Sequence, residues 1–113
     1  MNLSEKEQLF RLQAEICKTM SDAKRLRIIH ELREGELSVN ELCSRLGLSQ
    51  SNTSQHLSIL RRRGLVNARR EGTSIYYSLA NDRIAQACDI VRSVLNDQLK
   101  SNQDLAARLS QAK

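Results

Sequence analysis

The sequence predicts a mainly helical protein with one small β-hairpin, in the order ααααββα. Three observations lead to this fold class. Apolar residues recur at helical spacing over most of the chain, and the spacing changes to strict alternation only between Leu65 and Leu79. The absence of proline and the presence of only four glycines suit long helices joined by short turns. A length of 113 residues fits one domain, 1–113.

The first two helices are predicted from capping signals. Ser4 and Glu7 have the spacing of a capping box, so we expect the first helix from about residue 4 to about residue 20. Asp22 is the expected N-cap of the second helix, and Gly35 is its expected end. The second helix should turn its apolar stripe inward, with Leu26, Ile29 and Leu32.

Residues 38–63 have the pattern of a helix-turn-helix. Ser38 opens a second capping box for a short helix that ends before Gly47, and Ser49 caps a fourth helix that ends at Gly64. Two helices joined through a glycine-containing turn, the second polar on its outer side, are typical of this motif. The inward stripes of the two helices are expected to be Leu42, Cys43, Leu46, Thr53, Leu57 and Leu60.

The segment 65–79 is expected to form a β-hairpin directly after the motif, with Glu71-Gly72-Thr73 as its turn. A hairpin in this position is the wing of a winged helix-turn-helix. It would carry Arg69 and Arg70 near its tip, beside the fourth helix.

Asn81-Asp82 caps a final helix that we expect to reach about residue 110, although the segment 100–104 could break it. A domain of this size needs no helix of that length for its own core. Residues 1–20 and 81–110 are therefore predicted to form a dimerisation surface, with packing against the chain's own core as the alternative.

The positive charge of the chain is concentrated in one third of it. Residues 38–70 contain six arginines and one acid, whereas the remaining residues balance twelve bases against twelve acids. A clustered positive field predicts a nucleic-acid partner, and a solvated basic face is the alternative. The outer face of the fourth helix supports the first interpretation, because residues 50–60 contain small polar groups and no Glu or Lys.

The segments "LGLSQSNTSQHLSILRRRGLV" and "RREGTSIYYSL" within residues 21–79 resemble the ArsR/SmtB family of bacterial winged-helix repressors. The resemblance implies a homodimer that binds double-stranded DNA at a partly palindromic operator and is released by an effector. The base-reading positions that it implies are Ser49, Gln50, Ser51, Ser54 and Gln55, supported by Ser58, Arg61 and Arg62. It implies a wing formed by Arg69, Arg70, Gly72 and Thr73, and it places His56 in helix packing or at a phosphate.

The chain departs from the family at its metal sites. Ser38 and Asn40 stand where many members have metal-binding cysteines, and hydroxyl and amide groups cannot replace sulfur for soft metals. The zinc site between the last helices of other members needs histidines, and none follows His56. We therefore predict no metal and no cofactor.

Three cysteines remain, and two of them are candidate sensors. Cys17 and Cys88 lie on the two expected dimerisation helices, so a thiol-reactive effector there could change the angle between two DNA-reading heads. The alternative is that both are small buried packing residues, as we expect for Cys43. His30 is interpreted as a surface residue.

The remaining expectations concern protein class and compartment. No apolar run is long enough to span a membrane, and the acidic N-terminus does not resemble a signal peptide, so we expect a cytoplasmic protein. The chain has no glycine-rich phosphate loop and no catalytic pairing for its two histidines, which argues against an enzyme. A winged helix that binds protein or RNA without sensing an effector is the alternative, disfavoured by the scarcity of aromatic residues.

Overall fold

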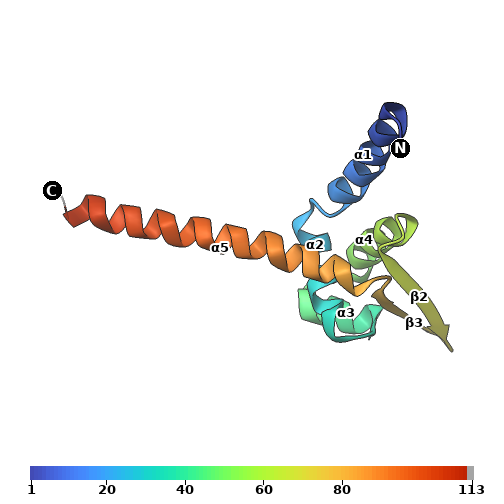
Figure 1. The fold of residues 1–113 in the computed structure, drawn as a ribbon. Coiled ribbons are helices and arrows are strands. Elements are labelled where there is room, and N and C mark those ends of the chain that lie inside the picture. Colours follow the sequence, from blue (N-terminus) through green and yellow to red (C-terminus); the bar gives the residue numbers. More distant parts are fainter. Residues whose placement is uncertain (112–113) are drawn as a thin grey trace.

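The computed structural model describes residues 1–111 and confirms the predicted fold class (Figure 1). The last two residues of the predicted domain, 112–113, lie outside the described part. One short strand and one turn of 3-10 helix add to the expected order. The elements are α1 (Leu3–Thr19), α2 (Ala23–Glu31), the 3-10 turn η1 (Leu32–Glu34), β1 (Leu37–Ser38), α3 (Val39–Leu46), α4 (Gln50–Arg62), β2 (Val66–Glu71), β3 (Ser74–Leu79) and α5 (Asp82–Gln111).

The wing is a three-stranded antiparallel sheet in the order β1-β3-β2. The β2–β3 hairpin closes at the pair Glu71↔Ser74 through a two-residue turn in which Gly72 has a φ of 62°. β1 pairs Leu37 with Tyr77 and therefore ties the start of the helix-turn-helix to the wing. Sequence patterns did not reveal β1, because two residues are too few to show alternation.

The core lies between α2, α3, α4 and the base of the wing. Thr53, Leu57 and Leu60 of α4 are all fully buried, as predicted. In α2 the expectation for Leu26 is wrong, because its side chain is 36% exposed and Ile28 takes its place in the core. Leu26 instead borders a small cleft beside α5. The other core residues are Ile29, Leu32, Leu37, Leu42, Leu46, Leu65, Val66, Tyr77 and Ala85.

Most of the predicted helix boundaries follow the expected capping chemistry. The Ser38 capping box is present in both directions, and Ser49 caps α4 by accepting a hydrogen bond from the backbone N–H of Asn52 at 3.1 Å. The predicted capping box at Ser4 is wrong. Asn2 caps α1 by accepting a hydrogen bond from Glu5 N at 2.8 Å, because Asn2 and Glu5 repeat the same cap spacing slightly earlier.

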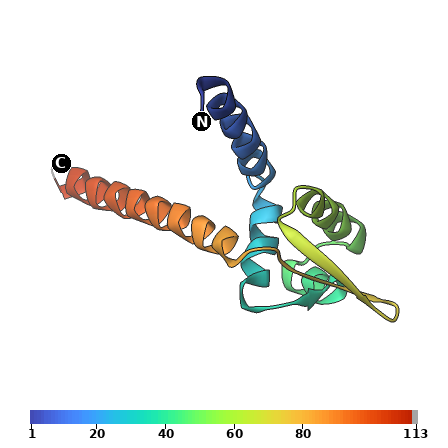
Figure 2. The ribbon, with the colours of Figure 1, turned by 45° about the vertical axis from the view of Figure 1, so that its right-hand side comes forward.

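α1 and α5 project away from the core on the side opposite the wing tip (Figure 2). The segment 100–104 does not break α5, which continues to Gln111. Within residues 1–111, α5 packs on the chain's own core through Ile84, Ala85 and Cys88 near its start, and its later apolar residues lie outside that core cluster. No helix of the described residues is long and apolar enough to cross a membrane. The large apolar side chains left exposed include Leu9, Phe10, Leu12, Ile16, Ile90, Val91, Val94, Leu95, Leu99, Leu105 and Leu109.

Candidate nucleic-acid interface

The predicted base-reading residues lie on the side of α4 that faces away from the core. The orientation of the helix is fixed by its buried face, which is Thr53, Leu57 and Leu60. The Thr53 hydroxyl donates to Ser49 O at 2.9 Å within the same helix, so it is not left unsatisfied in the core. This packing holds the polar face of α4 outward. Ser49, Gln50, Ser51, Gln55 and Ser58 are exposed, and Ser54 is half-buried.

The end of α4 concentrates positive charge. Arg61 and Arg62 are exposed and, within residues 1–111, neither forms an ion pair. Arg63 differs, because its Nη2 atom lies 3.1 Å from Glu15 Oε2 of α1. The cations also oppose the negative end of the helix dipole, which stabilises α4. Two of the three consecutive arginines are thus available for an anionic partner.

His56 is half-buried on the side of α4 that faces α2. Its Nδ1 lies 3.4 Å from Nη1 of Arg25, and in this contact the imidazole accepts a hydrogen bond from the guanidinium. This contact fits the packing role that the resemblance implies for His56, and the alternative contact with a phosphate stays a prediction. Arg25 itself was not identified from the sequence, because its partners are on other elements.

Arg69 of the wing is held by two carboxylates. Its Nη2 and Nε atoms donate to Glu36 at 2.6 and 3.0 Å, and Nη1 donates to Glu71 at 2.7 Å. The guanidinium also lies 4.8 Å from the ring centre of Tyr76, its cross-strand neighbour. Hydrogen bonds from Arg69 hold the pKa of Glu36 below its ordinary value, so the pair stays charged. Sequence reasoning missed Glu36, which is distant from Arg69 in the chain.

Arg70 lies on the opposite face of the same strand. Successive residues of a strand alternate between faces, so Arg70 shares a face with Ala68 while Arg69 shares one with Glu71. Arg70 is exposed and forms no ion pair among the described residues. Gly72 and Thr73, also exposed, form the tip beyond it. The wing therefore presents one arginine whose charge is neutralised by carboxylates, Arg69, and one whose charge is not, Arg70.

The two candidate sensing thiols, Cys17 and Cys88, lie on different helices and are both free. Cys17 is exposed on α1, Cys88 is half-buried where α5 meets α2, and no disulfide joins them. Burial and then the charge of Asp89 raise the pKa of the Cys88 thiol, which lowers its thiolate content at neutral pH. Cys43 is half-buried in α3. Among residues 1–111, no group of three or more metal-binding side chains lies together.

Comparison with known proteins gives a consistent picture. The family model described as "Bacterial regulatory protein, arsR family" matches residues 22–68. The uncharacterized HTH-type transcriptional regulator Rv0081 of Mycobacterium tuberculosis is 43% identical over 108 residues, covering 91% of this chain and 95% of that protein. The transcriptional activator HlyU of Vibrio cholerae is 43% identical over 91 residues, covering 80% and 84% of the two chains.

Solved structures resemble the fold over most of its length. The crystal structure of Rv0081 superposes with a TM-score of 0.75 at 43% identity and covers 83% of this chain and 95% of the other. The homodimeric winged helix-turn-helix DNA-binding domain Mb0332 of Mycobacterium bovis gives a TM-score of 0.78 at 31% identity, covering 88% and 93%.

Proposed function

The chain belongs to the ArsR family of bacterial regulatory proteins, and from this premise we propose that two copies bind a partly palindromic operator through α4 and the wing. It is a winged helix-turn-helix regulator of transcription and not an enzyme. The observation that carries the proposal is the outward polar face of α4, which ends in uncompensated arginines.

The proposed dimer interface is formed by α1 and α5. Both helices leave large apolar side chains in solvent, for example Phe10 at 66% exposure and Val91 at 70%. Exposed apolar faces of this length are costly in water and become favourable when a second copy covers them. A homodimer with two-fold symmetry would place its two recognition helices about 34–36 Å apart, one turn of duplex DNA.

We assign two kinds of contact to the proposed surface. Ser49, Gln50, Ser51, Ser54 and Gln55 would contact base edges in the major groove, because amide and hydroxyl groups both donate and accept hydrogen bonds. The remaining residues would contact the phosphate backbone of DNA and give an affinity that depends on salt. These are Ser58, Arg61 and Arg62 of α4, with Arg70, Gly72 and Thr73 of the wing. Arg69 lies beside them, and its charge is held by Glu36 and Glu71.

Release by an effector is the second part of the proposal. A thiol-reactive effector would act first at Cys17, which is exposed, because the raised pKa of Cys88 slows its reaction. Cys88 fits the packing alternative better, since it lies among core residues at the joint of α2 and α5. A comparison of reduced and persulfidated protein in the DNA-binding assay below tests this part separately.

Fluorescence anisotropy with a duplex from upstream of the chain's own gene, and with a scrambled duplex, tests the proposal. Gln55→Ala should weaken only the native duplex, by roughly 1–3 kcal/mol for one base contact. Arg62→Gln should weaken both duplexes alike and reduce the salt slope by about 0.9. Arg108→Gln, the same charge change near the far end of α5, is the control. Equal affinity of the unaltered protein for both duplexes would contradict sequence-specific binding.

A further inference from the structure

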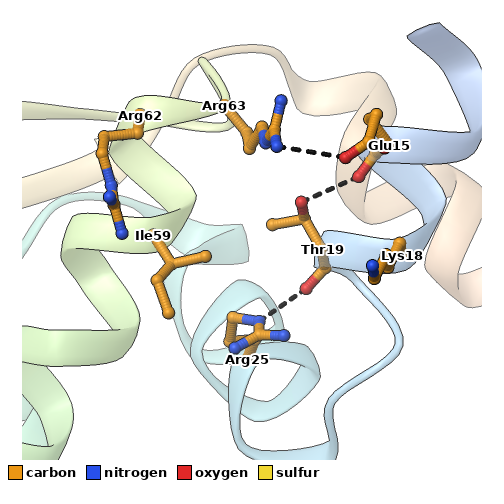
Figure 3. Close-up of a pocket in the computed structure, with 7 residues that line it drawn as sticks. All are labelled: Glu15, Lys18, Thr19, Arg25, Ile59, Arg62 and Arg63. Carbon is orange, nitrogen blue, oxygen red and sulfur yellow. Dashed lines mark hydrogen bonds and ion pairs between the residues drawn. The ribbon is translucent and has the colours of Figure 1, made fainter.

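A cavity of about 410 Å³ opens where the end of α1, the start of α2 and the last turn of α4 meet. Figure 3 shows Thr19 and Lys18 on the α1 side, Ile59 and Arg62 on the α4 side, and Arg25 of α2 below them. The volume falls within the roughly 300–1,000 Å³ of small-molecule sites. Neither the proposed base contacts nor the wing uses this space.

The cavity is strongly cationic. Lys18, Arg25, Arg62 and Arg63 line it, and Glu15 is its single acid, so its net charge is three positive. Glu15 neutralises only Arg63, at 3.1 Å. Within residues 1–111, Lys18 and Arg62 form no ion pair. Cations gathered around one space repel each other unless an anion occupies it.

Arg25 is fixed in position at the base of the cavity. Its Nε donates to the carbonyl oxygen of Thr19 at 2.6 Å, and its Nη1 lies 3.4 Å from His56 Nδ1. Thr19 is only 6% exposed, so this anchor belongs to the packed part of the chain. The Nη2 atom of Arg25 has no hydrogen-bond partner among the described residues. A guanidinium held in this way loses little conformational entropy when it binds an oxyanion.

We propose that this cavity binds a small phosphate dianion, either free phosphate or a phosphate monoester, between α1, α2 and α4. Three guanidiniums around one space suit a tetrahedral group with several oxygens better than a planar carboxylate with two. A phosphate monoester carries about −1.5 to −2 charge at neutral pH and would compensate most of the excess charge. A phosphodiester of DNA carries one charge and would compensate less.

Occupation of the cavity would act on DNA binding through Arg62. This consequence rests on the proposed function, in which Arg62 contacts a DNA phosphate. A dianion in the cavity would hold the Arg62 guanidinium toward α1 and remove that contact. The loss of one phosphate contact corresponds to roughly an eightfold weaker affinity at about 0.1 M salt.

The binding step is tested on the full chain without DNA. Inorganic phosphate is titrated at constant ionic strength, and the backbone and Arg Nε–Hε signals are followed by ¹H–¹⁵N NMR. We expect saturable shifts confined to residues 18–25 and 59–63, with a dissociation constant of about 1 mM. Acetate and dimethyl phosphate, which represent a carboxylate and the DNA backbone, should bind much more weakly. Equal binding of dimethyl phosphate, or no localised shifts with phosphate, would overturn the proposal.

Three variants separate the site from general charge effects. Lys18→Gln should weaken phosphate binding about three- to tenfold, as expected for one partly exposed charged contact. Glu15→Gln should tighten it by a similar factor, because it removes the competing carboxylate from Arg63. Lys6→Gln, the same charge change near the other end of α1, should leave it unaltered. A Lys6→Gln effect as large as that of Lys18→Gln would contradict a localised site.

A second readout links the site to DNA. Phosphate should weaken DNA binding by the unaltered protein, and Lys18→Gln should reduce this effect without changing DNA affinity in the absence of phosphate. Phosphate binding by NMR together with unchanged DNA affinity would overturn the link through Arg62. Failure of all DNA binding would contradict the proposed function and leave the NMR result standing.

Discussion

The carboxylate of Glu36 limits the charge that the wing can offer to DNA. It accepts two hydrogen bonds from Arg69, at 2.6 and 3.0 Å, and so neutralises the cation that lies beside the tip. Glu36→Gln removes the negative charge and keeps the shape of the side chain. Glu71 remains at 2.7 Å, but its side chain is 67% exposed and holds Arg69 through one hydrogen bond only. We therefore predict that Glu36→Gln releases Arg69 toward a DNA phosphate.

The magnitude follows from counterion release. One additional phosphate contact steepens the dependence of log K on log salt by about 0.9. Affinity for any duplex should then rise roughly eightfold at about 0.1 M salt. The gain should shrink by about 3.5-fold when salt is raised from about 50 to about 200 mM. The ratio of the affinities for the native and the scrambled duplex should stay the same, because the new contact is the same for every sequence.

Anisotropy titrations at several salt concentrations, with the native and the scrambled duplex, measure the salt slope and the ratio of the two affinities. Glu34→Gln is the matched control, since it makes the same charge change two residues away and Glu34 forms no ion pair in the described chain. If the two variants changed the salt slope equally, release of Arg69 would not be the cause. An unchanged slope for Glu36→Gln would refute the placement of Arg69 near a phosphate.

Three further predictions concern stability and assembly. Asp22→Ala should lower the free energy of unfolding in urea by about 1 kcal/mol at neutral pH. Hydrogen bonds from the backbone N–H groups of Arg25 and Lys24 hold the pKa of Asp22 below its ordinary 3.8, so this difference should disappear as pH falls below that value. Gly47→Ala should cost about 1–2 kcal/mol in the same assay, because φ is 66°, and Gly47→Asn should cost less. Leu95→Glu should shift the protein toward monomer in sedimentation velocity, whereas Gln103→Glu, outside the apolar stripe of α5, should not.

Local chemistry made much of the fold predictable. The caps at Ser38 and Ser49 and the left-handed turn at Gly47 each depend on side chains within a few residues, so their signals are visible in sequence order. The same locality explains the error at Ser4, because Asn2 offered an equivalent cap nearby. The segment 100–104 did not end α5, since unfavourable helix propensities of a few tenths of a kcal/mol per residue do not stop a long helix.

Contacts between distant elements could not be predicted in this way. The pairing of Arg69 with Glu36 and the cavity around Arg25 both join residues far apart in the chain. From the sequence, Arg69 and Arg70 were equivalent basic residues of one strand. The fold distinguishes them, because strand alternation places them on opposite faces and β1 brings Glu36 beside only one of them.

The strand order β1-β3-β2 leaves β2 at an open edge of the sheet, with main-chain donors and acceptors that another chain could pair with. Aggregation by edge pairing is opposed where an edge strand carries charge, and β2 carries Arg69, Arg70 and Glu71 in succession. The arginines of β2 thus also oppose edge-to-edge pairing between protein molecules that are not bound to DNA. Variants that neutralise both arginines would lower nucleic-acid affinity and colloidal protection together, so their solubility must be measured before their binding is interpreted.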